Sequence, residues 1–323
     1  LPDSLKMIRG RAFYNCSGLT GDLIIPDNVT YIGEYAFYGC YNIKGSLKLS
    51  EKLVTIGRYA FSRNSANNTK MGFSGSLVIP NNVKTIGHYA FNYCTNLRGS
   101  LNMSESLTSI GDYAFYYCEG FTGDLIIPKN VKSIGDYAFY YCRGFNGKLV
   151  LPNGLTSIGS YAFSSGASYN KMNFTGDLVI PNSVTSIGSY AFYNAGFNGD
   201  LILSESITNI NSYTFSYCSF KGNLRIPNSV TSIGNSAFYS CSSFDGDLSL
   251  PANLTTIGSS AFYGCSKFNV MYCYALTPPS AQSNSFTGHN ISILYVPEES
   301  VGTYYDTSPW DEFVILGLFK IKD

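Results

Sequence analysis

Apolar side chains alternate with other residues in short stretches that recur along the chain. In the stretch "DLIIP", residues 124–128, Leu125 and Ile127 occupy alternate positions, and the β-branched Ile126 stands between them. Alternation with a period of two predicts a short strand with one buried face. The strand is expected to end at Pro128, because proline has no N–H to donate to a neighbouring strand.

A second apolar pattern follows each predicted strand. After the strand that ends at Pro128, the apolar residues of this second pattern are Val131, Ile134, Ala138, Phe139 and Cys142. We expect this spacing to turn a corner and to return an apolar side to the interior.

The combined pattern is repeated along most of the chain, and the Phe of an Ala-Phe or Thr-Phe pair marks each copy. The markers are Phe13, Phe37, Phe61, Phe91, Phe115, Phe139, Phe163, Phe192, Phe215, Phe238 and Phe262. Successive markers are 23, 24, 29 or 30 residues apart. A period in the twenties is typical of a leucine-rich-repeat solenoid, whereas propellers and helical-hairpin arrays have longer periods.

A coil of this length cannot bury its own apolar face, so stacked coils share one continuous core. We therefore predict a single right-handed solenoid of about eleven coils, with a spacing of about 4.8 Å between paired strands. A parallel sheet is expected on one side of the coils, and loops or single-turn helices on the other.

The two ends of the repeat array differ. Residues 2–13 align with residues 26–37, so Leu1 matches the last residue of a strand, and we expect more protein upstream. The repeat decays after about residue 268, and a terminal coil is expected to cover the open core with polar or irregular structure. The predicted organisation is a solenoid over residues 1–265 and a C-terminal capping segment over residues 266–323.

The signature Pro, then Val/Leu-x-x-Ile-Gly-x-x-Ala-Phe-x-x-Cys, resembles the BspA-like type of leucine-rich repeat over about residues 1–265. The closing segments "TPPSAQSNSF", "LYVPEESVGTYYDTSPW" and "VILGL" resemble the ends of such proteins in host-associated anaerobic bacteria. The resemblance implies a secreted or surface-anchored protein that adheres to host or matrix proteins. It brings no catalytic residues and no cofactor to this chain.

Composition excludes some partners. The 323 residues include 21 Lys and Arg and 21 Asp and Glu, so the formal net charge is zero. No basic footprint for nucleic acid is present. No apolar run approaches the roughly 18 residues of a membrane span, and any membrane anchor is expected upstream of this chain.

Eight of the nine cysteines share one repeat position, four residues after the Ala or Thr of the marker pair. They are Cys16, Cys40, Cys94, Cys118, Cys142, Cys218, Cys241 and Cys265, whereas Cys273 stands apart. Equivalent positions stack in a row about 4.8 Å apart, which is too long between Cβ atoms for a disulfide and too linear for tetrahedral zinc. We therefore predict buried free thiols that pack as small apolar groups.

The chain offers little for catalysis or metal binding. Its two histidines, His88 and His289, form no recognisable arrangement with Ser, Cys or Asp. Five carboxylates share one position beside the strand, namely Asp22, Asp124, Asp177, Asp200 and Asp247. Calcium binding is one interpretation. Solvated turn residues are the favoured one, because Ser, Lys and Asn occupy this position in other coils.

Tyrosines form a second row, one residue before the Ala or Thr of each marker pair. They are Tyr35, Tyr59, Tyr89, Tyr113, Tyr137, Tyr161, Tyr190 and Tyr213. Stacked aromatic side chains stabilise neighbouring strands, and tyrosine is also enriched at binding surfaces. We favour packing, and recognition of a protein or a carbohydrate stays as the alternative.

The outward positions of the predicted strands are a candidate contact surface. They are Ile24, Lys48, Val78, Asn102, Ile126, Val150, Val179, Ile202, Arg225 and Ser249. Six of the ten are aliphatic, and an exposed aliphatic stripe of this length suggests a contact surface. The alternative is that β-branched residues are simply good strand formers.

Two long steps between markers contain similar inserts, "NTKMGFSG" at 68–75 and "YNKMNFTG" at 169–176. We expect the phenylalanine of each insert to belong to the core. The other candidate contact residues are Lys70, Met71, Lys171 and Met172. One interpretation is a duplicated block with tolerated insertions, and the other is a paired contact for one partner.

The sequence thus predicts a non-enzymatic, extracellular or cell-surface binding module. Its ligand would be a protein or a glycan, and no cofactor, metal or nucleic acid is expected. A structural stalk that displays other domains is the first alternative, and an enzyme acting on surface polysaccharide is the second.

Overall fold

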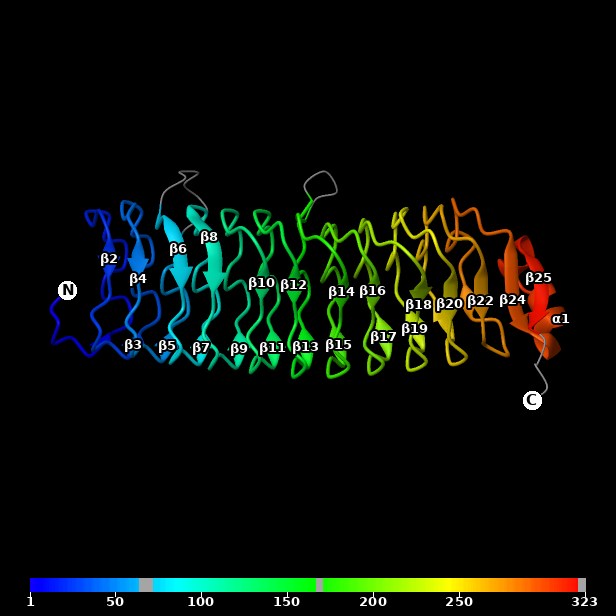
Figure 1. Cartoon of the computed structure of the whole chain (residues 1–323), viewed down its shortest axis with the longest axis horizontal. Coiled ribbons are helices and arrows are strands. Elements are labelled where there is room, and N and C mark those ends of the chain that lie inside the picture. The colour runs from blue at the N-terminus through cyan, green and yellow to red at the C-terminus, as the bar shows by residue number, and fades with distance from the viewer. Residues whose placement is uncertain (64–71, 167–170, 319–323) are drawn as a thin grey trace. The chain divides into compact units, whose positions relative to one another are not determined.

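The computed structural model describes residues 1–63, 72–166 and 171–318. The chain divides into two compact units, Leu1–Thr175 and Gly176–Asp323, called unit 1 and unit 2 below. Each unit is a parallel β-solenoid with almost no helix, and the described chain has about twelve coils. Within each unit the coils follow one another in sequence order (Figure 1). The predicted solenoid is confirmed.

The alternating Leu-x motif forms one strand in each coil. Neighbouring strands pair in parallel, so that Leu125 lies beside Leu149 and Ile126 beside Val150. We call these strands the first strand row. In unit 1 they are β2 (Leu23–Ile24), β4 (Leu47–Lys48), β6 (Gly75–Val78), β8 (Leu97–Asn102), β10 (Leu125–Ile126) and β12 (Leu149–Val150). In unit 2 they are β14 (Leu178–Val179), β16 (Leu201–Ile202), β18 (Leu224–Arg225), β20 (Leu248–Leu250), β22 (Met271–Cys273), β24 (Ile293–Pro297) and β25 (Val314–Leu318).

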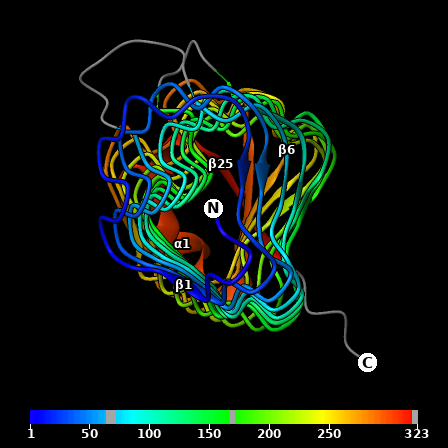
Figure 2. The same ribbon diagram turned by 90° about the vertical axis from the view of Figure 1, so that its left-hand side faces the viewer.

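A second strand, just before the Ile-Gly glycine, corrects the expectation of loops or single-turn helices there. These strands form the second strand row. In unit 1 they are β1 (Met7–Ile8), β3 (Tyr31–Ile32), β5 (Thr55–Ile56), β7 (Thr85–Ile86), β9 (Ser109–Ile110), β11 (Ser133–Ile134) and β13 (Ser157–Ile158). In unit 2 they are β15 (Ser186–Ile187), β17 (Asn209–Ile210), β19 (Ser232–Ile233), β21 (Thr256–Ile257) and β23 (Ser280–Ala281). Viewed along unit 1, β1 and β6 lie on different sides of the coil (Figure 2).

The glycine of the Ile-Gly signature permits close approach of neighbouring coils. A Cβ added at Gly135 would lie 2.5 Å from the backbone nitrogen of Asp112 in the preceding coil. A side chain at this position would therefore push the coils apart, and the second strand row could not pair.

The segment after this glycine is a turn that alternates its hydrogen bonds. Tyr137 and Tyr141 have the left-handed backbone conformation, with φ of 55° and 61°. The N–H groups of Tyr137, Phe139 and Tyr141 each donate to a carbonyl of the next coil at 2.8 Å. The N–H groups between them donate within the turn, for example Ala138 to Gly135 at 3.4 Å. Helix is excluded, because alternate N–H groups point to the next coil.

Phenylalanine fills the interior beneath this turn. Phe139 is fully buried, and its ring stacks on those of Phe115 and Phe163 with centroid distances of 5.2 and 5.5 Å. In unit 2, Phe238 stacks on Phe215 and Phe262 in the same way, at 5.4 and 5.3 Å. The inward position of the marker phenylalanine is confirmed in both units.

The end of unit 2 is more regular than the polar or irregular cap expected. Strands β22, β24 and β25 continue the first strand row in parallel register. Short helices η1 (Glu298–Ser300), α1 (Val301–Tyr305) and η2 (Trp310–Glu312) connect β24 to β25. The buried Trp310 donates from Nε1 to the carbonyl of Pro279 at 2.9 Å, and an apolar side chain thus covers the core here.

Candidate functional site

The outward side chains of the first strand row form a surface that we call face 1. In unit 1 its aliphatic members are strongly exposed: Ile24 by 57%, Val78 by 51%, Ile126 by 56% and Val150 by 44%. Because strands pair in register, these side chains lie in one row, with the exposed Lys48 next to Ile24. The predicted outward orientation of the row is confirmed, whereas its role as a contact surface remains a prediction.

Face 1 of unit 2 begins in the same way and then changes. Val179 and Ile202 are exposed by 49% and 51% and lie side by side. The next member, Arg225, forms an ion pair with Glu205. The row continues through Ser249.

The last three strands of face 1 present aromatic and aliphatic side chains. We call this group the cap patch, and it consists of Val270, Tyr272, Tyr274, Ile293, Tyr295, Val314 and Leu316. All seven are exposed or half-exposed. The sequence analysis did not identify these residues, because the coils that contain them lack the repeat signature. Period-two alternation in "VMYCY" and "ILYVP" is the signal that could have found them.

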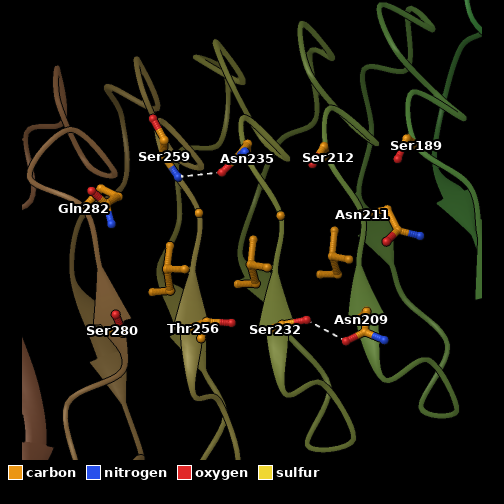
Figure 3. Close-up of a pocket in the computed structure, with 15 residues that line it drawn as sticks. Ser189, Asn209, Asn211, Ser212, Ser232, Asn235, Thr256, Ser259, Ser280 and Gln282 are labelled. Atoms are coloured by element: carbon orange, nitrogen blue, oxygen red, sulfur yellow. Dashed lines mark hydrogen bonds between the residues drawn. The ribbon is translucent and has the colours of Figure 1, made fainter.

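Face 2 is the outward surface of the second strand row, and in unit 2 it contains a groove of about 740 Å³ (Figure 3). The polar side chains that line it carry no charge: Ser189, Asn209, Asn211, Ser212, Ser232, Asn235, Thr256, Ser259, Ser280 and Gln282. Some bind one another, since the Ser232 hydroxyl donates to Asn209 Oδ1 at 2.5 Å. The groove therefore offers hydroxyl and amide groups, and no charged side chain, to a ligand. In unit 1, face 2 has titratable side chains nearby, with His88 Nδ1 and Asp112 Oδ2 3.0 Å apart.

The tyrosine row of unit 1 is a continuous stack. The rings are those of Tyr35, Tyr59, Tyr89, Tyr113, Tyr137 and Tyr161, with centroids 4.4–4.7 Å apart and planes within 10° of parallel. Burial between neighbouring rings raises the pKa of Tyr113 to about 12. The four inner rings are stacked on both faces, so they cannot also stack on a sugar. The packing interpretation is confirmed here.

The cysteine row is buried and contains no disulfide, as predicted. None of the nine cysteines forms a disulfide, and all but the half-buried Cys16 are buried. Cys142 Sγ donates to the carbonyl of Phe115 at 3.0 Å, and Cys265 Sγ donates to that of Phe238 at 3.1 Å. Burial raises the pKa of the Cys94 and Cys265 thiols to about 12. These thiols link neighbouring coils and are not in a reactive, ionised state.

The aspartate row beside the first strands also links coils. Asp124 Oδ1 accepts the backbone N–H of Lys148 at 2.7 Å, and Asp22 Oδ1 accepts that of Ser46 at 2.7 Å. This hydrogen bond lowers the pKa of Asp22. Among the residues that the structure describes, no three His, Cys, Asp or Glu side chains gather in a way that could hold a metal.

The inserted loops give a mixed outcome. Lys70 and Met71 lie outside the described residues. Lys171 is exposed, but Met172 is only 1% exposed, so its proposal as a contact residue is corrected. The expected burial of Phe73 and Phe174 is confirmed, at 4% and 1% exposed. Met172 stands two residues before Phe174 and shares its inward direction.

The two units carry opposite net charges, which the neutral total conceals. Unit 1 has 16 Lys and Arg against 10 Asp and Glu. Unit 2 has 5 Lys and Arg against 11 Asp and Glu. Counting charge separately for each half of the sequence would have shown this.

A family model for the BspA type leucine-rich repeat region matches residues 1–74, 73–179 and 168–292 in six copies. The chain belongs to this family. Leucine-rich-repeat solenoids of the BspA type are generally non-enzymatic, and leucine-rich-repeat proteins generally bind other proteins. No curated protein matches the sequence.

Solved structures of leucine-rich-repeat proteins are similar to this BspA-type chain. One from Bacteroides ovatus has a TM-score of 0.63 and 26% identity, over 99% of this chain and 83% of its own. A leucine-rich cell surface protein from Faecalibacterium prausnitzii has a TM-score of 0.47 and 20% identity, over 97% and 83%. The pneumococcal vaccine antigen PcpA has a TM-score of 0.46 and 17% identity, over 92% and 76%. In the described part of this chain, no helix is both long and apolar enough to cross a membrane.

Proposed function

We propose that this chain is a non-enzymatic binding module, displayed outside the cell, that recognises a protein through face 1. The carrying observation is the row of exposed aliphatic side chains on face 1, which are 44–57% exposed in both units. Isolated exposed aliphatic residues are ordinary, but Ile126 lies beside Val150 in unit 1 and Val179 beside Ile202 in unit 2, and adjacent exposed aliphatic side chains are a mark of a contact surface. The extracellular location is inferred from the BspA-type family alone.

The alternatives need features that support them less well. A stalk needs only a stable stack of coils. Exposed isoleucine and valine add nothing to such a stack, because strands with polar residues at these outward positions would pair equally well. An enzyme that hydrolyses polysaccharide needs two carboxylates facing one site. Asp22 and Asp124 instead use an oxygen to accept a backbone N–H of the next coil.

The test is an array of purified extracellular-matrix and host-surface proteins probed with the whole chain. A bound protein should lose at least ten-fold in affinity to the double variant Ile126→Ser/Val150→Ser. The matched control is Ser133→Ala/Ser157→Ala, which changes outward residues of the second strand row in the same coils. Equal affinity of both variants for the bound protein would remove face 1 from consideration.

A neutral glycan is the second candidate ligand, and the uncharged groove on face 2 of unit 2 favours it. Its serine, threonine and amide side chains match the hydroxyl groups of a sugar, and no charged group would have to be desolvated. A glycan array with wild type and with Asn211→Ala/Gln282→Ala tests this candidate. Retained glycan binding by the variant would exclude the groove.

A further inference from the structure

The cap patch is a compact apolar surface built on a rigid frame. The register places Tyr272 beside Tyr295 and Tyr295 beside Leu316, and in the adjacent row it places Ile293 beside Val314. Val314 is 56% exposed, Tyr274 45% and Leu316 40%. The core of unit 2 is already closed by Trp310, so these outward side chains are not needed to cover it.

The composition of the patch is that of a protein-binding site. Tyr272 and Tyr295 stack with centroids 5.3 Å apart, and Tyr272 and Tyr274 stack at 6.4 Å. Stacked tyrosines lose little conformational freedom on binding, and each keeps a hydroxyl group for a hydrogen bond. Such rigid aromatic residues dominate the binding energy of many interfaces.

Three acidic residues, Asp247, Glu298 and Glu299, lie close to the patch in register or in sequence. The strand register places Asp247 beside Val270. Burial of Tyr272 is the main reason that its pKa is raised, and the negative charge of Asp247 raises this pKa further. Glu298 and Glu299 follow directly after β24. Arg225, on face 1 of the same unit, is paired with Glu205. A partner of positive charge would therefore meet complementary charge here.

We infer that the cap patch docks a basic segment of a partner protein, in which Lys or Arg side chains alternate with aliphatic ones. This rests on the proposed function and adds the chemistry of the partner. The aliphatic side chains would cover Tyr272, Tyr295 and Leu316. The cationic side chains would reach Asp247 and the carboxylates after β24, and these carboxylates would repel partners of negative charge.

The probes are three labelled eight-residue peptides, which alternate Lys and Val, Glu and Val, or Lys and Ser. Fluorescence anisotropy with the whole chain should show that the Lys–Val peptide binds at least ten-fold more tightly than the other two. Its affinity should fall several-fold when the salt concentration is raised from about 50 to about 500 mM, since exposed charges are then screened.

Three variants locate the site. Tyr272→Ser/Tyr295→Ser and Val314→Lys should each weaken binding at least ten-fold, and Asp247→Asn about three-fold. Val314→Lys changes an exposed side chain, so it keeps the test valid if the tyrosine variant unfolds. The matched control is Ile126→Ser/Val150→Ser on face 1 of unit 1, which should bind the peptide as wild type does.

Each contrary result has a distinct meaning. Equal binding of the Glu–Val peptide, or no binding of the Lys–Val peptide, overturns the inferred partner chemistry. Unchanged affinity in Val314→Lys overturns the location. If sedimentation velocity shows a dimer that Val314→Lys dissociates, a second copy occupies the patch and the inference is wrong. A protein found on the array that needs Ile126 and Val150 but not Val314 would leave the proposed function standing while removing this inference.

Discussion

Unit 1 and unit 2 are built from one repeat and have nearly the same interior, but their surfaces differ. Phe139 in unit 1 and Phe238 in unit 2 are both fully buried in a phenylalanine stack. Outside, the six-membered tyrosine stack of unit 1 has a short counterpart in unit 2, where Tyr190 and Tyr213 stack at 4.4 Å and Ser236 follows. The net charge also changes sign between the units. The residue types at inward positions are thus constrained by stacking, whereas those at outward positions can change to suit a ligand.

The reason for this asymmetry is geometric. An inward side chain must fit the equivalent side chains of two neighbouring coils, so one altered residue disturbs three coils. An outward side chain on face 1 meets solvent, and its replacement changes little in the stack. The shared interior and the divergent surface can be tested separately.

The largest effect is expected from the interior. Phe139→Ala and Phe238→Ala should each reduce the free energy of unfolding by about 3–5 kcal/mol, because each leaves a cavity in the stack. Denaturant titrations monitored by hydrogen exchange, which separates the two units, would measure both. A loss in one unit of less than half that in the other would break the claim of a common interior.

The thiols should make both units sensitive to alkali. The folded pKa of Cys94 and Cys265 is about 12, above the ordinary value of 9.0, because burial disfavours the thiolate. Their contribution to stability is full below about pH 9 and falls as the pH rises toward 12, since only the unfolded chain ionises in this window. The loss approaches about 1.4 kcal/mol per pH unit for each buried thiol.

Alkali should also distinguish the units. Burial raises the pKa of Tyr113, in the tyrosine stack, and of Tyr117, which follows it in the same turn, to about 12, so both tyrosines add to the loss of stability of unit 1 above pH 10. Thiol labelling with mass spectrometry at increasing pH should therefore modify Cys118 before Cys241. Labelling of either cysteine at pH 7 without denaturant would contradict their burial.

Much of the fold was predictable, because alternation with a period of two determines which side chains of a strand face inward. Leu125 had to face inward if Ile126 faced outward, and the structure confirms both. The second strand row was missed because a two-residue strand such as Ser133–Ile134 shows no alternation. The turn was missed because Tyr137 adopts a backbone conformation that L-residues usually avoid.

The candidate site was less predictable, because surface residues are not fixed by the repeat. The outward positions of Ile126 and Val179 could be predicted from periodicity, but whether a partner binds them could not. Met172 was placed wrongly because an insert has no register with the other coils. The cap patch was not predicted, because the repeat pattern ends before Tyr272 and Tyr295, so these residues could not be aligned with the earlier coils.

The tyrosine stack is the next test of the difference between the units. Tyr137→Ser places in unit 1 the residue found at the same repeat position, 236, in unit 2. It should cost about 1–3 kcal/mol, since two ring contacts of 4.6 Å are lost and each is worth about 0.5–1.5 kcal/mol. Ser260→Ala in unit 2 is the matched control and should change stability by less than 0.5 kcal/mol, about the limit for surface substitutions. A similar loss in both variants would mean that the rings do not stabilise unit 1.

The smallest effect concerns the backbone beneath these side chains. Tyr137 and Ser260 have nearly the same left-handed φ, 55° and 54°. A left-handed conformation costs an L-residue about 1–2 kcal/mol, whereas glycine avoids this cost but loses about 0.5–1 kcal/mol through its more flexible unfolded state. Ser260→Gly should therefore stabilise unit 2 by up to about 1 kcal/mol. Tyr137→Gly gains the same relief but loses its ring contacts, so it should destabilise unit 1, and by less than Tyr137→Ala. Thermal unfolding of the three variants would measure this order. If Ser260→Gly destabilised unit 2 as much as Tyr137→Gly destabilises unit 1, the ring stack could not be what offsets the backbone strain in unit 1.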